Sequence, residues 1–223
     1  MKKAFLLVIL TISVSSLFAQ SFNIGIRGGL NESSLDYTQV PNNTPSRLAG
    51  FNAGLFVDYG LGDFTIEPGL FYTTKGQKNS FSSSGTANGE TSTTSGTGKV
   101  TYNYIELPLN ILYNIRIPIG KIFLGGGPYT AIGLSGTSKI TTTTNTNGVI
   151  TYGNYYSNNK LTFGNTVNDI KRQDYGLGAI GGLRLKNGLM VSAGYEHGLS
   201  NIANAGTEVK HDVINFSIGY AFL

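Results

Sequence analysis

Apolar and polar residues alternate with a period of two through most of the chain, in segments separated by connections that are short and long in turn. Residues 105–113, for example, place large apolar side chains on one face of an extended strand and Glu106 and Asn110 on the other. Successive side chains of a β-strand point to opposite faces, so this period is that of a half-buried strand. The pattern therefore predicts an all-β protein.

Eight segments carry the alternation, at about 21–33, 48–60, 63–76, 100–114, 121–134, 173–186, 189–200 and 209–223. Short connections lie at 60–63, 114–120 and 186–188, and long ones at 34–47, 76–99, 135–172 and 201–208. With an even number of strands, all long connections fall at one end of the sheet and both termini at the other. This is the layout of a transmembrane antiparallel up-and-down β-barrel with short periplasmic turns and long extracellular loops.

The N-terminus has the pattern of an export signal. Lys2 and Lys3 precede an apolar run over residues 4–14, and a cleavage junction follows at Ala19-Gln20. The apolar run is shorter than the roughly 20 residues that a spanning helix needs, so we interpret it as a cleaved signal. We expect a signal peptide over 1–19 and one outer-membrane barrel domain over 20–223, inserted by the barrel-assembly machinery.

Composition narrows the class of protein further. Charged residues make up only 13% of the sequence, whereas about 25% is usual for a soluble domain. This favours a membrane barrel over a secreted, lipocalin-like ligand-binding barrel, which needs many charges on its outer face and stays open as an alternative. No cluster of Lys and Arg points to nucleic acid. The absence of Cys excludes disulfides and thiolate metal sites.

The polar faces of the strands hold mostly Gly, Ser, Thr and Asn, with a few charges: Arg27, Glu67, Glu106, Arg184 and Glu196. Eight strands enclose a space just wide enough for side chains, and an unpaired charge inside it is very costly. We therefore expect these charges to pair in a structural network that fills the lumen. A small porin-like channel through the polar interior is the alternative.

Aromatic residues on the apolar faces gather toward the two ends of the strands. Toward the short turns lie Phe22, Tyr59, Phe64, Tyr113, Tyr220 and Phe222, and toward the long loops Phe51, Tyr72, Tyr175 and Tyr195. Membrane proteins favour aromatic side chains at both bilayer interfaces. We predict that these residues form two girdles in contact with outer-membrane lipid.

Catalytic chemistry finds little support in the sequence. Glu196, His197 and Ser200 are the one trio whose types and spacing suggest a nucleophilic triad, but neighbouring strand residues point to opposite faces. His197 and His211 belong to no His–carboxylate motif typical of a metal site. We predict no catalytic, metal-binding or cofactor-binding residues, and no enzyme activity.

Glycine and proline mark irregular points in the strands. The run Gly125-Gly126-Gly127 lacks the Lys-Ser/Thr and the helix of a phosphate loop, so it predicts close packing or bending of a strand. Pro68, Pro108 and Pro128 each remove a backbone donor within a predicted strand. We expect bulges or gaps in the pairing there.

The long connections are the candidate binding regions. Residues 76–99 and 135–147 consist mostly of Ser, Thr, Gly and Asn, which bury too little apolar area to offset chain entropy, so we expect them to be mobile. The aromatic segment 152–157 is expected to extend the neighbouring strands as a hairpin. Because loops on rigid scaffolds often carry binding, we expect an external ligand or envelope protein to bind through 76–99 and 135–172.

Four short blocks resemble a known family: Tyr104-Ile-Glu-Leu-Pro-Leu109, Gly125-Gly-Gly-Pro-Tyr129, Asp174-Tyr-Gly-Leu-Gly178 and Tyr195-Glu-His-Gly-Leu-Ser-Asn-Ile202. They are similar to recurring blocks of the outer-membrane β-barrel family common in Bacteroidota, which includes PorT-like proteins tied to type IX secretion. The resemblance implies an outer-membrane location and a barrel fold. It selects no activity, and no residue here selects the secretion-linked subgroup. Together these features predict a non-enzymatic barrel with a structural, binding or envelope-complex role.

Overall fold

Nine strands make up the fold in a computed structural model that describes residues 22–36, 43–147, 149–206 and 208–222. They are β1 (Phe22–Asp36), β2 (Asn43–Leu61), β3 (Phe64–Ala87), β4 (Glu90–Ile117), β5 (Gly120–Thr146), β6 (Val149–Leu161), β7 (Gln173–Leu185), β8 (Leu189–Gly198) and β9 (Lys210–Phe222). The predicted signal peptide over 1–19 lies outside the described residues. Among the described residues, no helix is long and apolar enough to cross a membrane.

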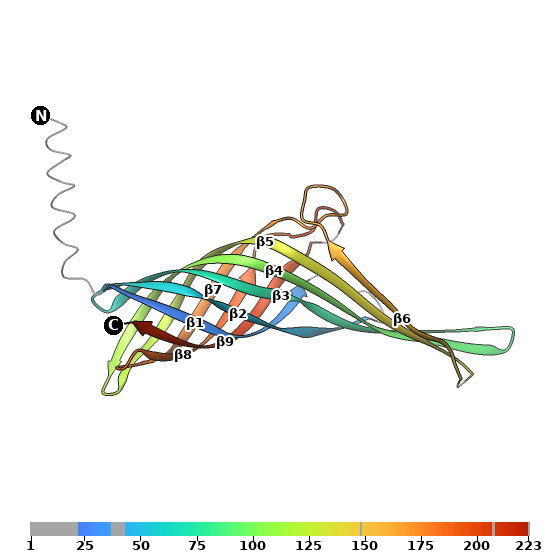
Figure 1. Ribbon diagram of the computed structural model, residues 1–223, viewed down its shortest axis with the longest axis horizontal. Coiled ribbons are helices and arrows are strands. Elements are labelled where there is room, and N and C mark those ends of the chain that lie inside the picture. The colour runs from blue at the N-terminus through green and yellow to red at the C-terminus, as the bar shows by residue number, and fades with distance from the viewer. Residues whose placement is uncertain (1–21, 37–42, 148, 207, 223) are drawn as a thin grey trace, which may run out of the picture.

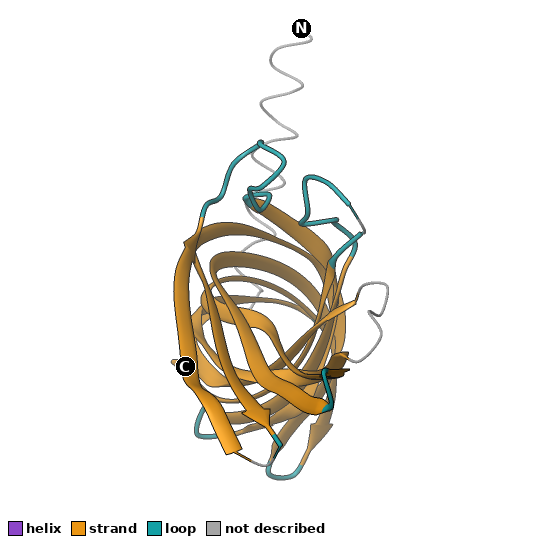
Figure 2. Cartoon of the chain, turned by 90° about the vertical axis from the view of Figure 1, so that its right-hand side faces the viewer, coloured by secondary structure: helices purple, strands orange, loops and turns teal. Residues whose placement is uncertain are grey.

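Eight of these strands close into a ring, in the order β1-β2-β3-β4-β5-β7-β8-β9, and every neighbouring pair is antiparallel. The ring closes where β1 pairs with β9, with Ile24 opposite Phe222. Figure 2 shows the closed ring of strands. The predicted all-β, up-and-down barrel of eight strands is confirmed, and β6 is an additional strand that pairs with β5 outside the ring.

The long connections differ from the prediction. β3 and β4 continue as a paired hairpin up to Ala87 and Glu90, and β5 continues to Thr146 and pairs with both β4 and β6. The expectation of loops over 76–99 and 135–147 is therefore wrong, because strand pairing satisfies the backbone without an apolar core and Thr favours strands. Together with β6 these ends form a projecting sheet, the arm sheet, of residues 78–99, 139–147 and 149–160 (Figure 1).

The segment 152–157, expected to form a hairpin with the neighbouring strands, belongs to β6. It pairs with the end of β5, with Thr144 opposite Tyr152 and Thr141 opposite Tyr156. The hairpin therefore forms with the strand before the segment, and the chain reaches β7 only after residues 162–172.

Proline and glycine residues affect the pairing and the spacing of the strands. The β3–β4 pairing is interrupted between Pro68 and Phe71, and the β4–β5 pairing between Pro108 and Ile111, with the register unchanged on both sides. These gaps agree with the missing backbone donors. A Cβ on Gly125 would lie 1.9 Å from the Ile111 carbonyl oxygen, so the glycine run permits the close approach of the strands that we predicted.

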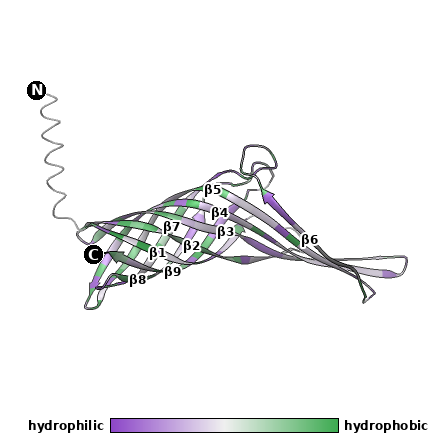
Figure 3. Ribbon diagram, viewed as in Figure 1, coloured by the Kyte–Doolittle hydropathy of each residue, from purple (hydrophilic) through white to green (hydrophobic). Residues whose placement is uncertain are grey.

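The outer wall of the ring is apolar and the arm sheet is polar. Figure 3 shows hydrophobic residues concentrated on the barrel, whereas the projecting strands are mainly pale or hydrophilic. The apolar stretches 64–72 and 105–113 lie opposite one another, and a tilted transmembrane strand needs about 9–11 residues. The wall therefore has the length to cross a bilayer.

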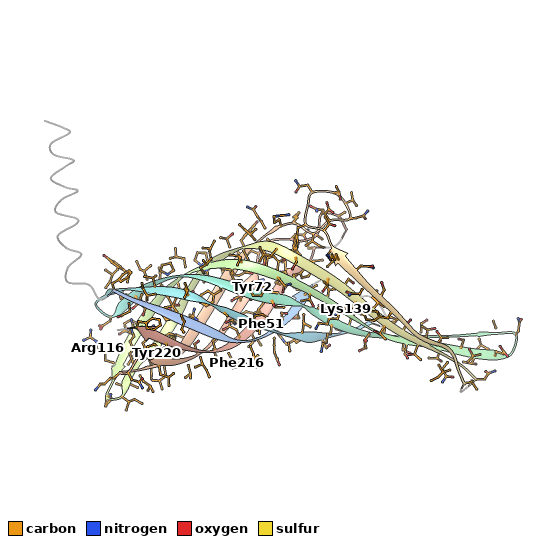
Figure 4. The ribbon with its side chains drawn as sticks, viewed as in Figure 1. Phe51, Tyr72, Arg116, Lys139, Phe216 and Tyr220 are labelled. Atoms are coloured by element: carbon orange, nitrogen blue, oxygen red, sulfur yellow. The ribbon has the colours of Figure 1, made fainter. Side chains whose placement is uncertain are left out.

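The aromatic residues predicted for the two girdles all lie on this outer wall, exposed or half-exposed. Phe51 and Tyr72 stack with ring centroids 5.5 Å apart, and Phe64 and Tyr113 lie 5.3 Å apart. Figure 4 shows Tyr220 toward the turn end, near Arg116, and Phe51 and Tyr72 toward the arm sheet. Their contact with lipid stays a prediction.

Two apolar clusters fill the inside of the ring. The first, toward the short turns, consists of Phe56, Phe71, Leu112, Phe123, Met190 and Ala221. The second, toward the arm sheet, consists of Tyr102, Tyr104, Ala131 and Ile202. The connections after β6 and after β8 cover the second cluster, because Ile170 bridges to Phe163 and Ala203 and Lys171 N donates to the Ile202 carbonyl at 2.8 Å.

Candidate functional site

A buried lysine lies at the centre of the lumen charges. Lys75 comes from β3, and its Nζ lies 2.6 Å from Glu106 Oε2 of β4, 3.1 Å from Glu196 Oε2 of β8 and 3.6 Å from Asp174 Oδ2 of β7. The ammonium also faces the Tyr129 ring, 4.2 Å from its centroid. Side chains from five strands thus meet at one cation, and we call this group the Lys75 cluster. Because the lysine is fully buried, its charge requires these partners.

Asp174 joins the Lys75 cluster to the connections after β6 and β8 that cover the second apolar cluster, which we call the cap. Its Oδ2 lies 3.2 Å from His211 Nδ1, and its Oδ1 accepts a hydrogen bond from Ser200 Oγ at 2.6 Å. The His211 ring meets the Tyr102 and Tyr104 rings edge-on, each with centroids 5.6 Å apart. The polar cluster and the apolar cluster beneath the cap are therefore one packed unit.

A second set of charges lies toward the short turns. Arg27 Nη1 donates to Glu67 Oε1 at 3.1 Å, and Arg184 Nη1 donates to Asp58 Oδ2. Both guanidinium groups lie over the Phe56 ring, at 5.2 and 5.5 Å from its centroid. Charge pairing and cation–π contact together hold this end of the lumen closed.

Between these two sets of charges lies a cavity of about 50 Å³, lined among others by Arg27, Glu106 and Glu196. A volume of that size holds a few water molecules, since each needs roughly 10–15 Å³. Aromatic and aliphatic side chains close it on the turn side and the cap closes it on the other. In the described part of the chain, side chains therefore fill most of the lumen around this cavity.

The predicted lumen charges fall into these two sets. Arg27 and Glu67 pair directly, Glu106 and Glu196 share Lys75, and Arg184 pairs with Asp58. The lumen charges predicted from the sequence did not include Asp58, Lys75 or Asp174, although Lys75 follows Thr73 by two residues and so falls on the same polar face. Continuing the alternation by one further step would have found it.

The arrangement does not support nucleophilic catalysis. Glu196 contacts Lys75 inside the ring, whereas His197 Nδ1 lies 2.7 Å from Asp212 Oδ1 on the outer side, so the two side chains diverge as predicted. Ser200, Asp174 and His211 do come together, but the carboxylate lies between the hydroxyl and the imidazole. An activated serine needs the imidazole in the middle position.

Among the described residues, no group of His, Asp and Glu has the arrangement of a metal site. In the Lys75 cluster, the position between three carboxylates is taken by the lysine ammonium itself.

A comparison with protein families matches residues 18–204 to the outer membrane protein beta-barrel domain. The chain belongs to this family. It is therefore an outer-membrane β-barrel protein, as the closed ring of strands and the apolar wall independently indicate. This match does not show whether the chain belongs to the Bacteroidota or PorT-like members, so that narrower assignment stays a prediction. No curated protein matches the chain.

Solved structures of outer-membrane barrels resemble this one in fold. Ail, the attachment invasion locus protein of Yersinia pestis, is 16% identical over 90% of this chain and 98% of its own, with a TM-score of 0.40. Neisserial surface protein A is 14% identical over 91% and 99%, with a TM-score of 0.38. OprG from Pseudomonas aeruginosa is 13% identical over 91% and 97%, with a TM-score of 0.31.

The four sequence blocks that carry the family resemblance meet at the Lys75 cluster of this outer-membrane barrel. They contribute Tyr104, Glu106, Tyr129, Asp174, Glu196 and Ser200. In this chain the blocks therefore supply the packing of the lumen.

Proposed function

We propose that this outer-membrane barrel is a non-conducting, non-enzymatic anchor that presents the arm sheet for binding outside the cell. The observation that carries the proposal is the contrast between the two ends of the molecule. The described lumen holds a cavity of about 50 Å³, whereas β3, β4 and β5 continue beyond the apolar wall and form a polar sheet together with β6. A filled interior suits an anchor, and an exposed sheet on a rigid anchor suits binding.

The proposed orientation puts the described chain ends and the short turns in the periplasm. Supporting it, Ile24 and Phe222 pair at the end of the ring that carries the short turns. The arm sheet lies at the opposite end (Figure 1). Barrels of this class have short periplasmic turns and longer extracellular segments, so the arm sheet would face the surroundings.

A role in an envelope complex is the second candidate function, and the edges of the arm sheet favour it. Among the described strands, β6 pairs with β5 alone, and the pairing of β2 with β3 ends at Phe81. Both edges leave backbone donors and acceptors unpaired, to which a strand of another protein can add. The secretion-linked role implied by the PorT-like resemblance would use such a contact.

Cysteine labelling tests the proposed orientation, on which the binding role depends, because the chain has no Cys of its own. Thr93→Cys lies in the arm sheet and Lys186→Cys in a short turn. On intact cells, a membrane-impermeant maleimide is expected to label the first variant and not the second, and opening the outer membrane should expose both. Labelling of Lys186→Cys alone on intact cells would contradict the proposed orientation.

A further inference from the structure

The outer face of the arm sheet carries a row of lysines that nothing in the barrel neutralises. Lys78 of β3 lies directly opposite Lys99 of β4, and Lys99 lies directly opposite Lys139 of β5. All three side chains are exposed. Like charges directly opposite one another destabilise a sheet, so an anion bound to the three lysines would stabilise this row.

A further lysine lies near this row, and acidic residues are scarce around it. Lys160 of β6 lies opposite Thr137, one row closer to the barrel on the same face. Ion pairs among the described residues involve none of the four lysines. Over 76–103 and 135–161 the sole acidic residue is Glu90, at the tip of the β3–β4 hairpin. The face is therefore strongly positive.

Hydroxyl groups border the lysine row on both sides. The next row outward brings Ser80, Thr97, Thr141 and Tyr156 side by side, and the row inward brings Thr101 opposite Thr137. Strands lie about 4.8 Å apart, so the three lysines span about 10 Å. A flat surface of cations between hydroxyl donors matches a ligand with several anionic groups on a hydroxyl-rich frame, which describes a phosphorylated saccharide.

The distance of the lysine row from the apolar wall indicates which lipid headgroups can contact it. Lys78 follows the girdle residue Tyr72 by six positions on the same outward face of β3. Six residues span about 20 Å along a strand. Because strands of such a barrel tilt by about 40°, Lys78 lies about 15 Å beyond Tyr72 along the barrel axis. Phospholipid headgroups add only about 6 Å beyond the hydrocarbon on each side. A lipid with an extended saccharide headgroup reaches the row.

We propose that Lys78, Lys99 and Lys139, with Lys160 beside them, bind the phosphate-bearing saccharide headgroup of a glycolipid in the outer leaflet around the barrel. The inference rests on the proposed orientation of the arm sheet. Charge complementarity and continuity with the lipid-facing wall favour this occupant. Figure 4 shows Lys139 on the arm side of Phe51 and Tyr72, beyond the girdle.

Binding of purified lipopolysaccharide to the folded, full mature chain in detergent tests the proposal. The variant Lys78→Gln/Lys99→Gln/Lys139→Gln is expected to weaken binding at least about tenfold, since each lysine near an anionic lipid surface contributes about a fivefold effect. The matched control Arg116→Gln/Arg172→Gln/Lys186→Gln removes the same charge from exposed residues elsewhere and should stay within about threefold. Heat-modifiable gel migration verifies folding of both.

Two further measurements separate the ligand sources. Dephosphorylated lipopolysaccharide should bind as weakly to the native chain as the intact glycolipid binds to the lysine variant. Heparin, a soluble polyanion, should compete poorly; equal or tighter binding of heparin would overturn the lipid assignment in favour of a soluble glycan. Unchanged affinity of the lysine variant would overturn the proposal altogether.

The orientation can fail separately from the chemistry of the site. If Lys99→Cys resists an impermeant maleimide on intact cells while lipopolysaccharide binding in detergent keeps its dependence on the lysines, the proposed orientation is wrong and the anion site stands. If Lys99→Cys is labelled and binding ignores the lysines, the orientation stands and the anion site is wrong.

Discussion

Lys75 Nζ lies 2.6 Å from Glu106 Oε2 in the centre of the barrel, although on the two neighbouring strands Lys75 lies opposite Tyr102 and Glu106 opposite Phe71. Glu196 and Asp174 complete the contact from the other side of the ring. This cluster ties β3 and β4 to β7 and β8 across the lumen. It therefore links strands that share no backbone hydrogen bonds.

Removal of the central cation should be strongly destabilising. We expect Lys75→Met to lower the free energy of unfolding by about 3–5 kcal/mol, because three buried carboxylates lose their shared partner. Urea unfolding in detergent, followed by heat-modifiable gel migration, measures the change. Lys78→Met is the matched control, since this lysine is exposed and should change stability by no more than about 0.5 kcal/mol. Equal effects would contradict the structural role of Lys75.

Neutralising Glu106 separates a packed lumen from a conducting one. We expect no stable conductance in planar bilayers from either the native chain or Glu106→Gln, because apolar clusters close the cavity on both sides. The substitution should alter stability by at most about 1–3 kcal/mol through its lost charged contact. A stable conductance that Glu106→Gln changes would favour the channel alternative.

Gly25 permits the Phe56 ring to lie against the wall. A Cβ at this position would come 2.2 Å from Phe56 Cζ, and the ring is confined by the guanidinium groups of Arg27 and Arg184. We expect Gly25→Ala to cost about 1–3 kcal/mol through overpacking, measured by the same unfolding assay. Gly85→Ala, where nothing lies within 4 Å, should be neutral. In the double variant Gly25→Ala/Phe56→Leu, the leucine leaves room for the added Cβ, so part of the lost stability should be recovered.

The arm sheet should be dispensable for the barrel. Asn79 faces Gly98 and Lys139 faces Asn158, so an Asn-Gly turn can replace residues 80–97 and another can replace 140–157. We expect the shortened chain to insert and to unfold within about 1 kcal/mol of the native chain, because shortening a connection changes its closure entropy little. Failure to form a heat-modifiable barrel would show that the arms contribute to folding.

Much of the barrel could be predicted from local pattern. Alternation separates the outward girdle residue Tyr72 from the inward Thr73, and the same parity extended to Lys75 places its side chain inside. Strand number and the closed ring followed from the same pattern together with the connection lengths. Composition misled the interpretation of 76–99 and 135–147, because a low-complexity polar segment lacks a core but can still pair its backbone with neighbouring strands.

The sequence by itself determined which side chains face the lumen and which face outward, because that choice follows from the two-residue repeat of each strand. The tertiary structure alone decided which lumen charges meet. Lys75 contacts Glu196 across the ring, and Arg184 of β7 pairs with Asp58 of β2, a strand distant in the sequence. These contacts depend on how the closed ring staggers its strands, a property of the whole barrel that no single strand's pattern contains.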